Sequence, residues 1–414
     1  MEKKNSKGTL LALFITVFVD LLGVGIVIPV LPLLFADPSS GLFSADVKYE
    51  SRLLLYGFLS AAFPLAQFFG APILGALADR YGRKPILALS LCGTLLGYVV
   101  FAWAVMNGNL IMLFVSRALD GFTGGNISVA FSSIADISDE KNKTRNFGLI
   151  GMAFGLGFII GPYIGGKLAD PNVVSWFNYS TPFWAAALLS ALNLLLVFFV
   201  YQETIRQKKH TAVSLTTGFK NVAKAFASAN LRTMFVVMFL TTFGFQFFTQ
   251  FFQIFLSDKF GYTASDVGDI FAYIGIWIAI TQGGLTRPMS KYLTPKQTLN
   301  FTIFCLGFTF MILVLPEQRS VLYFILPLIA IFQGLLSPNA LNLVSSQASP
   351  EEQGEIMGIN QSVSALAQAV PPIIAGYIVS IDRNLPIMVA SGCTLLAAVI
   401  FVALFRERKS STAV

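Results

Sequence analysis

Long apolar runs separated by short polar segments set the pattern of this chain. A helix needs about 20 predominantly apolar residues to cross the hydrocarbon core of a bilayer. Twelve runs have this character, in two groups of six on either side of a polar stretch from Glu203 to Arg232. They lie near residues 9–34, 52–77, 86–106, 110–136, 146–169, 181–202, 233–256, 265–287, 298–316, 320–347, 356–380 and 385–405. The pattern predicts an all-α polytopic membrane protein with twelve transmembrane helices: a six-helix bundle over 1–202, a linker over 203–232 and a second six-helix bundle over 233–414.

Composition excludes most other classes. Hydrophobic residues make up 55% of the 414 positions and charged residues only 12%, which is too few to cover the surface of a soluble enzyme. Intrinsic disorder is excluded by the excess of apolar residues, and a transmembrane β-barrel by the continuous rather than alternating runs. The first run is too long for a signal-peptide core and lacks a small-residue cleavage site, so we expect it to remain a membrane helix. We expect no metal site, because His210 is the only histidine and the three cysteines lie in apolar runs.

The distribution of lysine and arginine predicts the orientation. With the N-terminus inside, 21 of the 28 basic residues fall in inside segments and six in outside segments, while Arg117 lies within an apolar run. Cytoplasmic loops carry such an excess, so both termini and the linker are predicted to be cytoplasmic. The net charge of +7 is explained in this way, and we expect no nucleic-acid partner.

The two halves of the chain repeat one another. Three residues of the fifth run recur 210 positions later, and two residues of the fourth run recur 213 positions later. The pairs are Gly148 and Gly358, Pro162 and Pro372, Gly166 and Gly376, Gly121 and Gly334, and Asn126 and Asn339. Repeated six-helix halves are typical of transporters, with the substrate site between the halves near the bilayer midplane.

A charged turn follows the second run and reads Gly75-Ala-Leu-Ala-Asp79-Arg80-Tyr-Gly82-Arg83-Lys84-Pro85. A carboxylate and a guanidinium there can form a latch, although an inside loop with an incidental acid is the alternative. The turn resembles, at every position, the signature of the major facilitator superfamily. That resemblance implies the major facilitator fold and a cytoplasmic gate. The gate residues would be Gly75, Asp79, Arg80, Gly82, Arg83 and, at the inner end of the fourth run, Asp136.

Charges inside apolar runs are the candidate proton-coupling residues: Asp20, Arg117 and Asp120. Such charges are costly and must face a partner or a wet cavity. Burial favours the neutral acid and a nearby arginine favours the carboxylate, so we expect Asp20 to cycle between these forms close to Arg117. An Arg117–Asp120 pair that only locks its helix and a structural Asp20–Arg117 ion pair are the alternatives. The runs around Asp20 and Arg117 resemble those of the superfamily's proton-driven drug exporters, which implies a role of Arg117 in proton transfer.

Small residues recur along the fifth run at Gly157, Gly161, Pro162, Gly165 and Gly166. They allow close helix contact, and tight packing alone would explain them. The segment resembles the antiporter motif of exporters in the superfamily, which implies outward transport. Among 40 phenylalanines, a few polar residues are candidate substrate ligands: Asn126, Gln250, Gln333 and Asn339. Buried interhelical hydrogen bonds explain these four nearly as well.

Nearly the whole chain resembles the twelve-helix drug:proton antiporters that include the tetracycline exporters. The resemblance implies a secondary transporter that exports a small amphipathic or drug-like compound in exchange for protons by alternating access. We therefore expect a transporter and not an enzyme, with the proton gradient in place of a cofactor. We also expect a monomer, and the short termini fit a bacterial inner membrane. Two alternatives remain open on the same residues: a carrier of a metabolite, sugar or lipid, and a non-transporting receptor or sensor.

Overall fold

The computed structural model describes residues 6–44, 46–138, 140–205, 216–227, 231–346 and 353–405. Part of the predicted linker, residues 206–215 and 228–230, lies outside them. Within the described residues the secondary structure is helical, as the sequence predicts. Nine of these helices are long and apolar enough to cross a membrane.

The helices of the first half follow the predicted runs closely. They are α1 (Ser6–Ala36), α2 (Tyr49–Tyr81), α3 (Arg83–Met106), α4 (Leu110–Thr123), α5 (Asn126–Ile137), α6 (Glu140–Ala169) and α7 (Thr181–Phe199), with a short 3-10 turn η1 at Pro38–Ser40. The fourth run is therefore two helices rather than one. The break falls at Gly124 and Gly125, since glycine weakens a helix interior and lets the chain turn.

A short helix, α8 (Thr217–Ala227), lies in the linker, and the second half follows it. Its elements are α9 (Arg232–Phe260), α10 (Ala264–Ile280), η2 (Thr281–Leu285), α11 (Thr286–Met289), α12 (Pro295–Leu313), α13 (Arg319–Ser346), α14 (Gln353–Ala369), α15 (Pro371–Ile378) and α16 (Leu385–Leu404). The run near 356–380 is broken before Pro371 and Pro372, because proline supplies no backbone N–H to continue the helix. The run near 265–287 passes through the π-helical segment η2.

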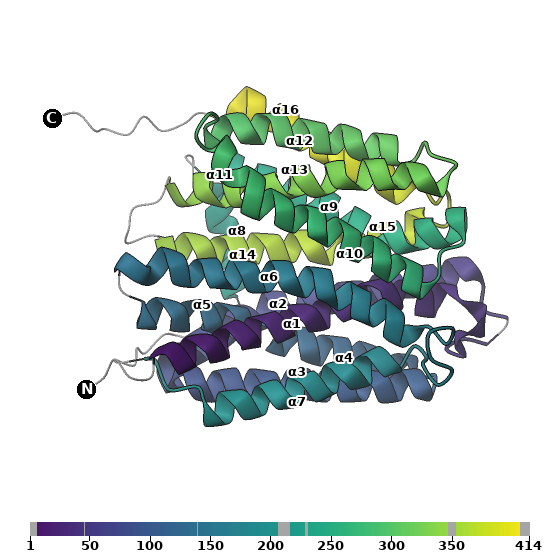
Figure 1. The fold of residues 1–414 in the computed structure, drawn as a ribbon, viewed down its shortest axis with the longest axis horizontal. Helices are drawn as coiled ribbons and strands as arrows, with labels where there is room; N and C mark the ends of the chain where they lie inside the picture. Colours follow the sequence, from purple (N-terminus) through teal and green to yellow (C-terminus); the bar gives the residue numbers. More distant parts are fainter. Residues whose placement is uncertain are drawn as a thin grey trace.

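The long helices lie side by side, and those of the two halves form neighbouring groups (Figure 1). In the first half α1 packs on α6, α2 on α4, and α3 on both α4 and α7. In the second half α9 packs on α16, and α12 on α13 and α16. The groups meet where α6 packs on α10 and where α2 packs on α14 and α15. We call the end of the bundle where α1 begins and α16 ends the near end, and the opposite end the far end.

Phenylalanines of α9 form much of the core of the second half. Phe247, Phe248, Phe251, Phe252 and Phe255 are each at most 1% exposed. Ring contacts link Phe248 to Phe252 and, across to α12, to Phe310. These five rings therefore pack in the interior of the second half.

Candidate functional site

A charged cluster lies at the near end, where α2 turns into α3. The Arg83 guanidinium contacts two carboxylates, with Nη1 2.6 Å from Asp79 Oδ1 and Nε 3.2 Å from Asp136 Oδ2. Arg83 is 8% exposed, whereas the Asp79 and Asp136 side chains are 31% and 27% exposed, so these charge-assisted contacts lie at the edge of the protein with the guanidinium buried. The structure thus brings three of the predicted gate residues together and ties the α2–α3 turn to the end of α5.

Glu203, which the motif did not include, completes this cluster. Its carboxylate accepts hydrogen bonds from the backbone N–H groups of Arg83 (2.9 Å) and Lys84 (3.1 Å), the first residues of α3. An acid at this position satisfies orphan donors and complements the helix dipole. The next residue, Thr204, donates from Oγ1 to Asp136 Oδ2 at 3.1 Å. The start of the linker is therefore bound to the gate cluster.

The remaining residues of the motif have different surroundings. Gly82 has φ +119°, which requires glycine, and a Cβ there would lie 2.5 Å from Glu203 Oε2 and displace that carboxylate. Gly75 faces α5, where a Cβ would lie 4.0 Å from Ser128 Oγ. Arg80 is exposed, and its guanidinium lies 5.3 Å from the Tyr81 ring centre.

Two separate polar pairs contain the predicted proton-coupling residues. Asn126 Nδ2 donates to Asp20 Oδ2 at 2.5 Å, joining α5 to the middle of α1. Arg117 Nη2 lies 3.4 Å from Asp120 Oδ2, and both side chains are more than nine-tenths buried. The Arg117 guanidinium also lies 4.9 Å from the Phe101 ring centre. The expected Asp20–Arg117 pair is not formed: Asn126 takes the place beside Asp20, and Arg117 sits nine residues earlier, across the break between α4 and α5, where it pairs within its own helix.

The antiporter-motif glycines make two helix contacts. Gly157, Gly161 and Gly165 face α1, where added Cβ atoms would strike backbone atoms between Leu21 and Ile26. Gly166 faces α10 instead, and a Cβ there would strike Ala264 O and lie 3.0 Å from Gly268 Cα. The motif therefore brings α6 close to its neighbour in the first half and to a helix of the second half.

The contact between α6 and α10 has a counterpart between α2 and α15. A Cβ on Gly268 would lie 2.7 Å from Pro162 O and 3.2 Å from Gly166 Cα. A Cβ on Gly57 would strike Pro372 O and lie 3.3 Å from Gly376 Cα. Gly57 and Gly268 are 211 positions apart, close to the repeat of the proline and glycine they contact. We call these two contacts the paired glycine clasps.

Polar contacts join the two halves in the far part of the bundle. The Tyr49 hydroxyl donates to the Asp258 carboxylate at 2.8 and 2.9 Å, and the Tyr56 hydroxyl donates to Gln250 O at 2.6 Å. Lys167 Nζ lies 2.9 Å from Asp269 Oδ2. These three contacts each join a helix of the first half directly to a helix of the second half. Together with the clasps, these contacts close the far end between the halves.

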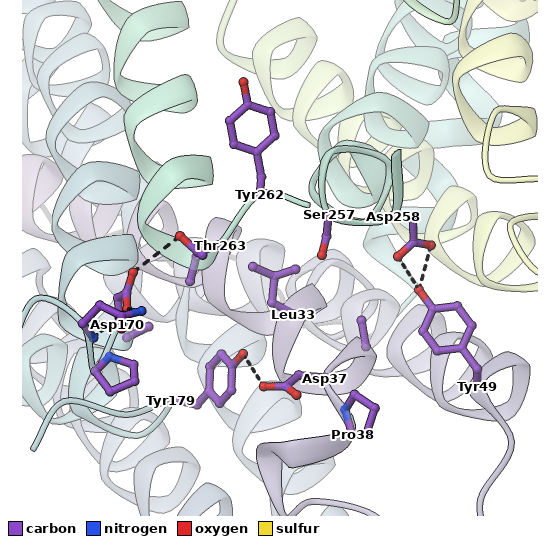
Figure 2. A pocket seen from close by; sticks show the side chains of 15 residues that line it. Leu33, Asp37, Pro38, Tyr49, Asp170, Tyr179, Ser257, Asp258, Tyr262 and Thr263 are labelled. Atoms are coloured by element: carbon purple, nitrogen blue, oxygen red, sulfur yellow. Dashed lines mark hydrogen bonds between the residues drawn. The ribbon is translucent and has the colours of Figure 1, made fainter. Parts of the chain in front are cut away.

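A cavity of about 460 Å³ lies outside this closure, at the far end (Figure 2). Both halves line it, and it contains three carboxylates, those of Asp37, Asp170 and Asp258. Each accepts a hydrogen bond, and Tyr179 donates to Asp37 at 2.9 Å. Burial, followed by the charge of Asp37, raises the pKa of the Tyr179 hydroxyl, so it remains a donor at physiological pH.

The four predicted substrate ligands form separate hydrogen bonds in this structure. Asn126 is 2% exposed and binds Asp20, and Gln250 accepts the Tyr56 hydrogen bond. Gln333 and Asn339 both form bonds within α13, to Ser337 Oγ at 3.4 Å and to Leu335 O at 2.7 Å. Asn126 and Gln250 therefore form interhelical hydrogen bonds, which is the alternative role that the sequence allowed for them.

Comparison with known proteins agrees with this architecture. The sequence model of the Major Facilitator Superfamily matches residues 13–372 and 301–414, so the chain belongs to this superfamily of membrane transporters. The tetracycline resistance protein, class C, of Escherichia coli is 32% identical over 376 residues, 89% of each chain. Multidrug resistance protein 1 of Bacillus subtilis (strain 168) is 29% identical over 397 residues, 94% of each chain.

A solved structure gives the same fold. The crystal structure of a D-xylose–proton symporter superposes with a TM-score of 0.77 over 98% of this chain and 99% of that one, at 13% identity. The predicted fold and the resemblance to the superfamily's drug exporters are confirmed. The chain is a multi-pass membrane transporter of small molecules rather than an enzyme.

Proposed function

We propose that this chain exports a small amphipathic, drug-like compound in exchange for protons by alternating access. The observation that carries the proposal is Asp20, a partly exposed carboxylate in the middle of α1 whose hydrogen-bond partner is a neutral amide. An amide can hold either form of the acid, so Asp20 can gain or lose a proton without breaking an ion pair. The similarity to tetracycline and multidrug resistance proteins supports this class of cargo.

The distribution of basic residues indicates which end of the bundle faces the cytoplasm. They concentrate at the near end, which we place in the cytoplasm, so the far end faces outward. The paired glycine clasps and the Tyr49–Asp258 contact then close the outward side, and the conformation is inward-facing. In this state Arg83 binds Asp79 and Asp136 within the first half. Outward opening requires the clasps to separate while the near end closes.

We assign the moving units to residues 1–202 and 233–414, joined by the linker 203–232. Helix α8 of the linker touches both units. Phe68 of α2 packs against Gly218 and Phe219, and Asn221 Nδ2 donates to Ser362 Oγ of α14 at 3.2 Å. The transporter works as a monomer in a bacterial inner membrane, and the proton gradient supplies the driving force, so no cofactor is required.

Proton movement in inside-out vesicles tests the proposal. Vesicles are energised to an acidic interior, and a pH-sensitive dye reports proton efflux when a tetracycline, a lipophilic cation or a sugar is added. We expect a tetracycline or the cation to release protons from wild-type vesicles. Asp20→Asn should abolish this release, because the amide cannot carry the proton. Asp46→Asn, the same change in an exposed loop, should leave it intact.

Each other outcome has a defined meaning. Normal drug-driven proton release by Asp20→Asn would remove Asp20 from the mechanism. A response to sugars alone would identify a sugar carrier and overturn the assignment of cargo.

A further inference from the structure

Tyr98 of α3 lies between the carboxylate of Asp20 on α1, which is partly exposed, and the buried carboxylate of Asp120 on α4. Its side chain is 3% exposed. The hydroxyl rests against Gly23 of α1 so closely that a Cβ on Gly23 would overlap it. Gly23 follows Asp20 by three residues, so both lie on one face of α1. The phenol oxygen is therefore within one helical turn of the position of Asp20.

The same face of α3 covers the Arg117–Asp120 pair. Gly97, next to Tyr98, lets Asp120 approach so that an added Cβ would lie 2.9 Å from Asp120 Cβ. Phe101, one turn beyond Tyr98, packs on the Arg117 guanidinium. A row of α3 residues thus lies against the ion pair on one side, and Tyr98 reaches α1 on the other.

Three charged groups act on Tyr98, and all belong to the proposed coupling set. They are Asp120, Arg117 and Asp20, which lie close enough to act on it electrostatically. Helix α7, which packs on α3, contains no Asp, Glu, Lys, Arg or His between Thr181 and Phe199. The charges of Asp20 and Asp120 also act on one another. Protonation of either carboxylate therefore changes the electrostatic field at Tyr98 and at the other carboxylate.

We propose that Tyr98 is a positioning residue for proton coupling, which donates its hydroxyl hydrogen bond to Asp20 when Asn126 releases it and so links Asp20 to the Arg117–Asp120 pair. This inference rests on the proposed proton exchange. A phenol in a low-dielectric site remains a neutral donor, and donation to a carboxylate favours its ionised form. Tyr98 thereby sets the pH at which the proton leaves, without carrying the proton itself.

Tyr98→Phe removes only the oxygen and tests this role. We measure drug-driven proton release in inside-out vesicles as a function of cytoplasmic-side pH. Loss of the donor makes the carboxylate keep its proton to higher pH. We expect the midpoint to rise by about one pH unit, the size of shift that corresponds to one hydrogen bond to a charged group. Gly23→Ala, whose methyl group displaces the hydroxyl, should shift the midpoint in the same direction.

Tyr273→Phe is the matched control, since its hydroxyl donates to the Tyr323 backbone carbonyl at 2.9 Å in the second half. It should leave the midpoint unchanged. Drug–drug exchange in vesicles without a gradient shows whether each variant still binds and moves substrate. A wild-type midpoint in Tyr98→Phe overturns the inference, and so does loss of drug–drug exchange, because the hydroxyl would then support the fold or the cargo. An absence of drug-driven proton release in the wild type would instead overturn the proposed function.

Discussion

Individual residues at the near end show which contacts of the gate cluster the sequence motif predicts and which it does not. The resemblance of the charged turn to the superfamily signature implied that Asp79, Arg83 and Asp136 form one group, and the structure places both carboxylates in contact with Arg83. Glu203 lies 120 positions after Arg83, and nothing in the turn points to it. The one available signal is an acid directly after the sixth apolar run, and it becomes informative only once the fold brings α7 beside α3.

Gly82 provides a prediction at this scale. Its φ of +119° and the proximity of Glu203 both oppose a side chain. We expect Gly82→Ala to lower the free energy of unfolding by about 1–2 kcal/mol, the cost of an unfavourable backbone conformation for a residue with a Cβ. Thermal unfolding in detergent measures this. Gly392→Ala, at a helical glycine with open space around it, serves as the control and should unfold no earlier than the wild type. Equal melting temperatures for the two variants would contradict the prediction.

Glu203 provides a second prediction. Glu203→Gln keeps the shape of the side chain but removes the charge at the start of α3. We expect a loss of about 1 kcal/mol in the free energy of unfolding, because the carboxylate interacts with the helix dipole and accepts from the first two backbone N–H groups of α3. The same melting experiment measures it. Asp46→Asn, the same loss of charge at an exposed acid in a loop, is the control and should have little effect. A drop no larger than that of the control would argue against the capping role.

At the scale of elements, the length of the apolar runs predicted the membrane-spanning segments. The positions at which these segments break into separate helices were seen only in the structure. The break at Gly124 and Gly125 determines which side chain lies beside Asp20. It places Asn126 at the start of α5, where it binds Asp20, and leaves Arg117 within α4. Hydrophobicity alone did not separate these helices, since both are apolar. The sequence showed that Pro162 and Gly166 recur as Pro372 and Gly376. Their respective partners, Gly268 and Gly57, lie in other apolar runs, and these contacts became visible only from the packing of the helices.

The paired glycine clasps give a prediction about the far end. Gly57→Ala and Gly268→Ala each place a methyl group against a backbone carbonyl, which flexible side chains cannot relieve. Overpacking costs about 1–3 kcal/mol, so we expect the closed far end to be about tenfold less populated. An impermeant thiol reagent added outside intact cells should then label Ser60→Cys faster, in a chain whose three native cysteines are replaced.

Gly155→Ala is the control for both clasps. It lies on α6, like the antiporter motif, but an added Cβ there meets nothing within 4 Å. Its labelling rate should equal that of the parent chain. If only Gly268→Ala accelerates labelling, the α2–α15 clasp does not contribute to the closure.

At the scale of the whole molecule, two helical units are closed at the far end, and a protonatable carboxylate lies at mid-depth on α1. One fold can transport many different cargoes. The proposed function is therefore defined by the direction of transport and by its coupling to protons. The internal repeat indicated this architecture from the sequence. The cargo was not predictable in the same way, because the four polar candidates are engaged in hydrogen bonds in this conformation.

The most direct test of the central claim is accumulation of labelled tetracycline by inside-out vesicles on which an acidic interior is imposed. Export coupled to protons predicts uptake against the drug's concentration gradient. That uptake should collapse when a protonophore dissipates the pH difference, and it should be lost in Asp20→Asn. Accumulation that persists after the gradient is dissipated, or movement of the drug only down its own gradient, would contradict proton-driven export.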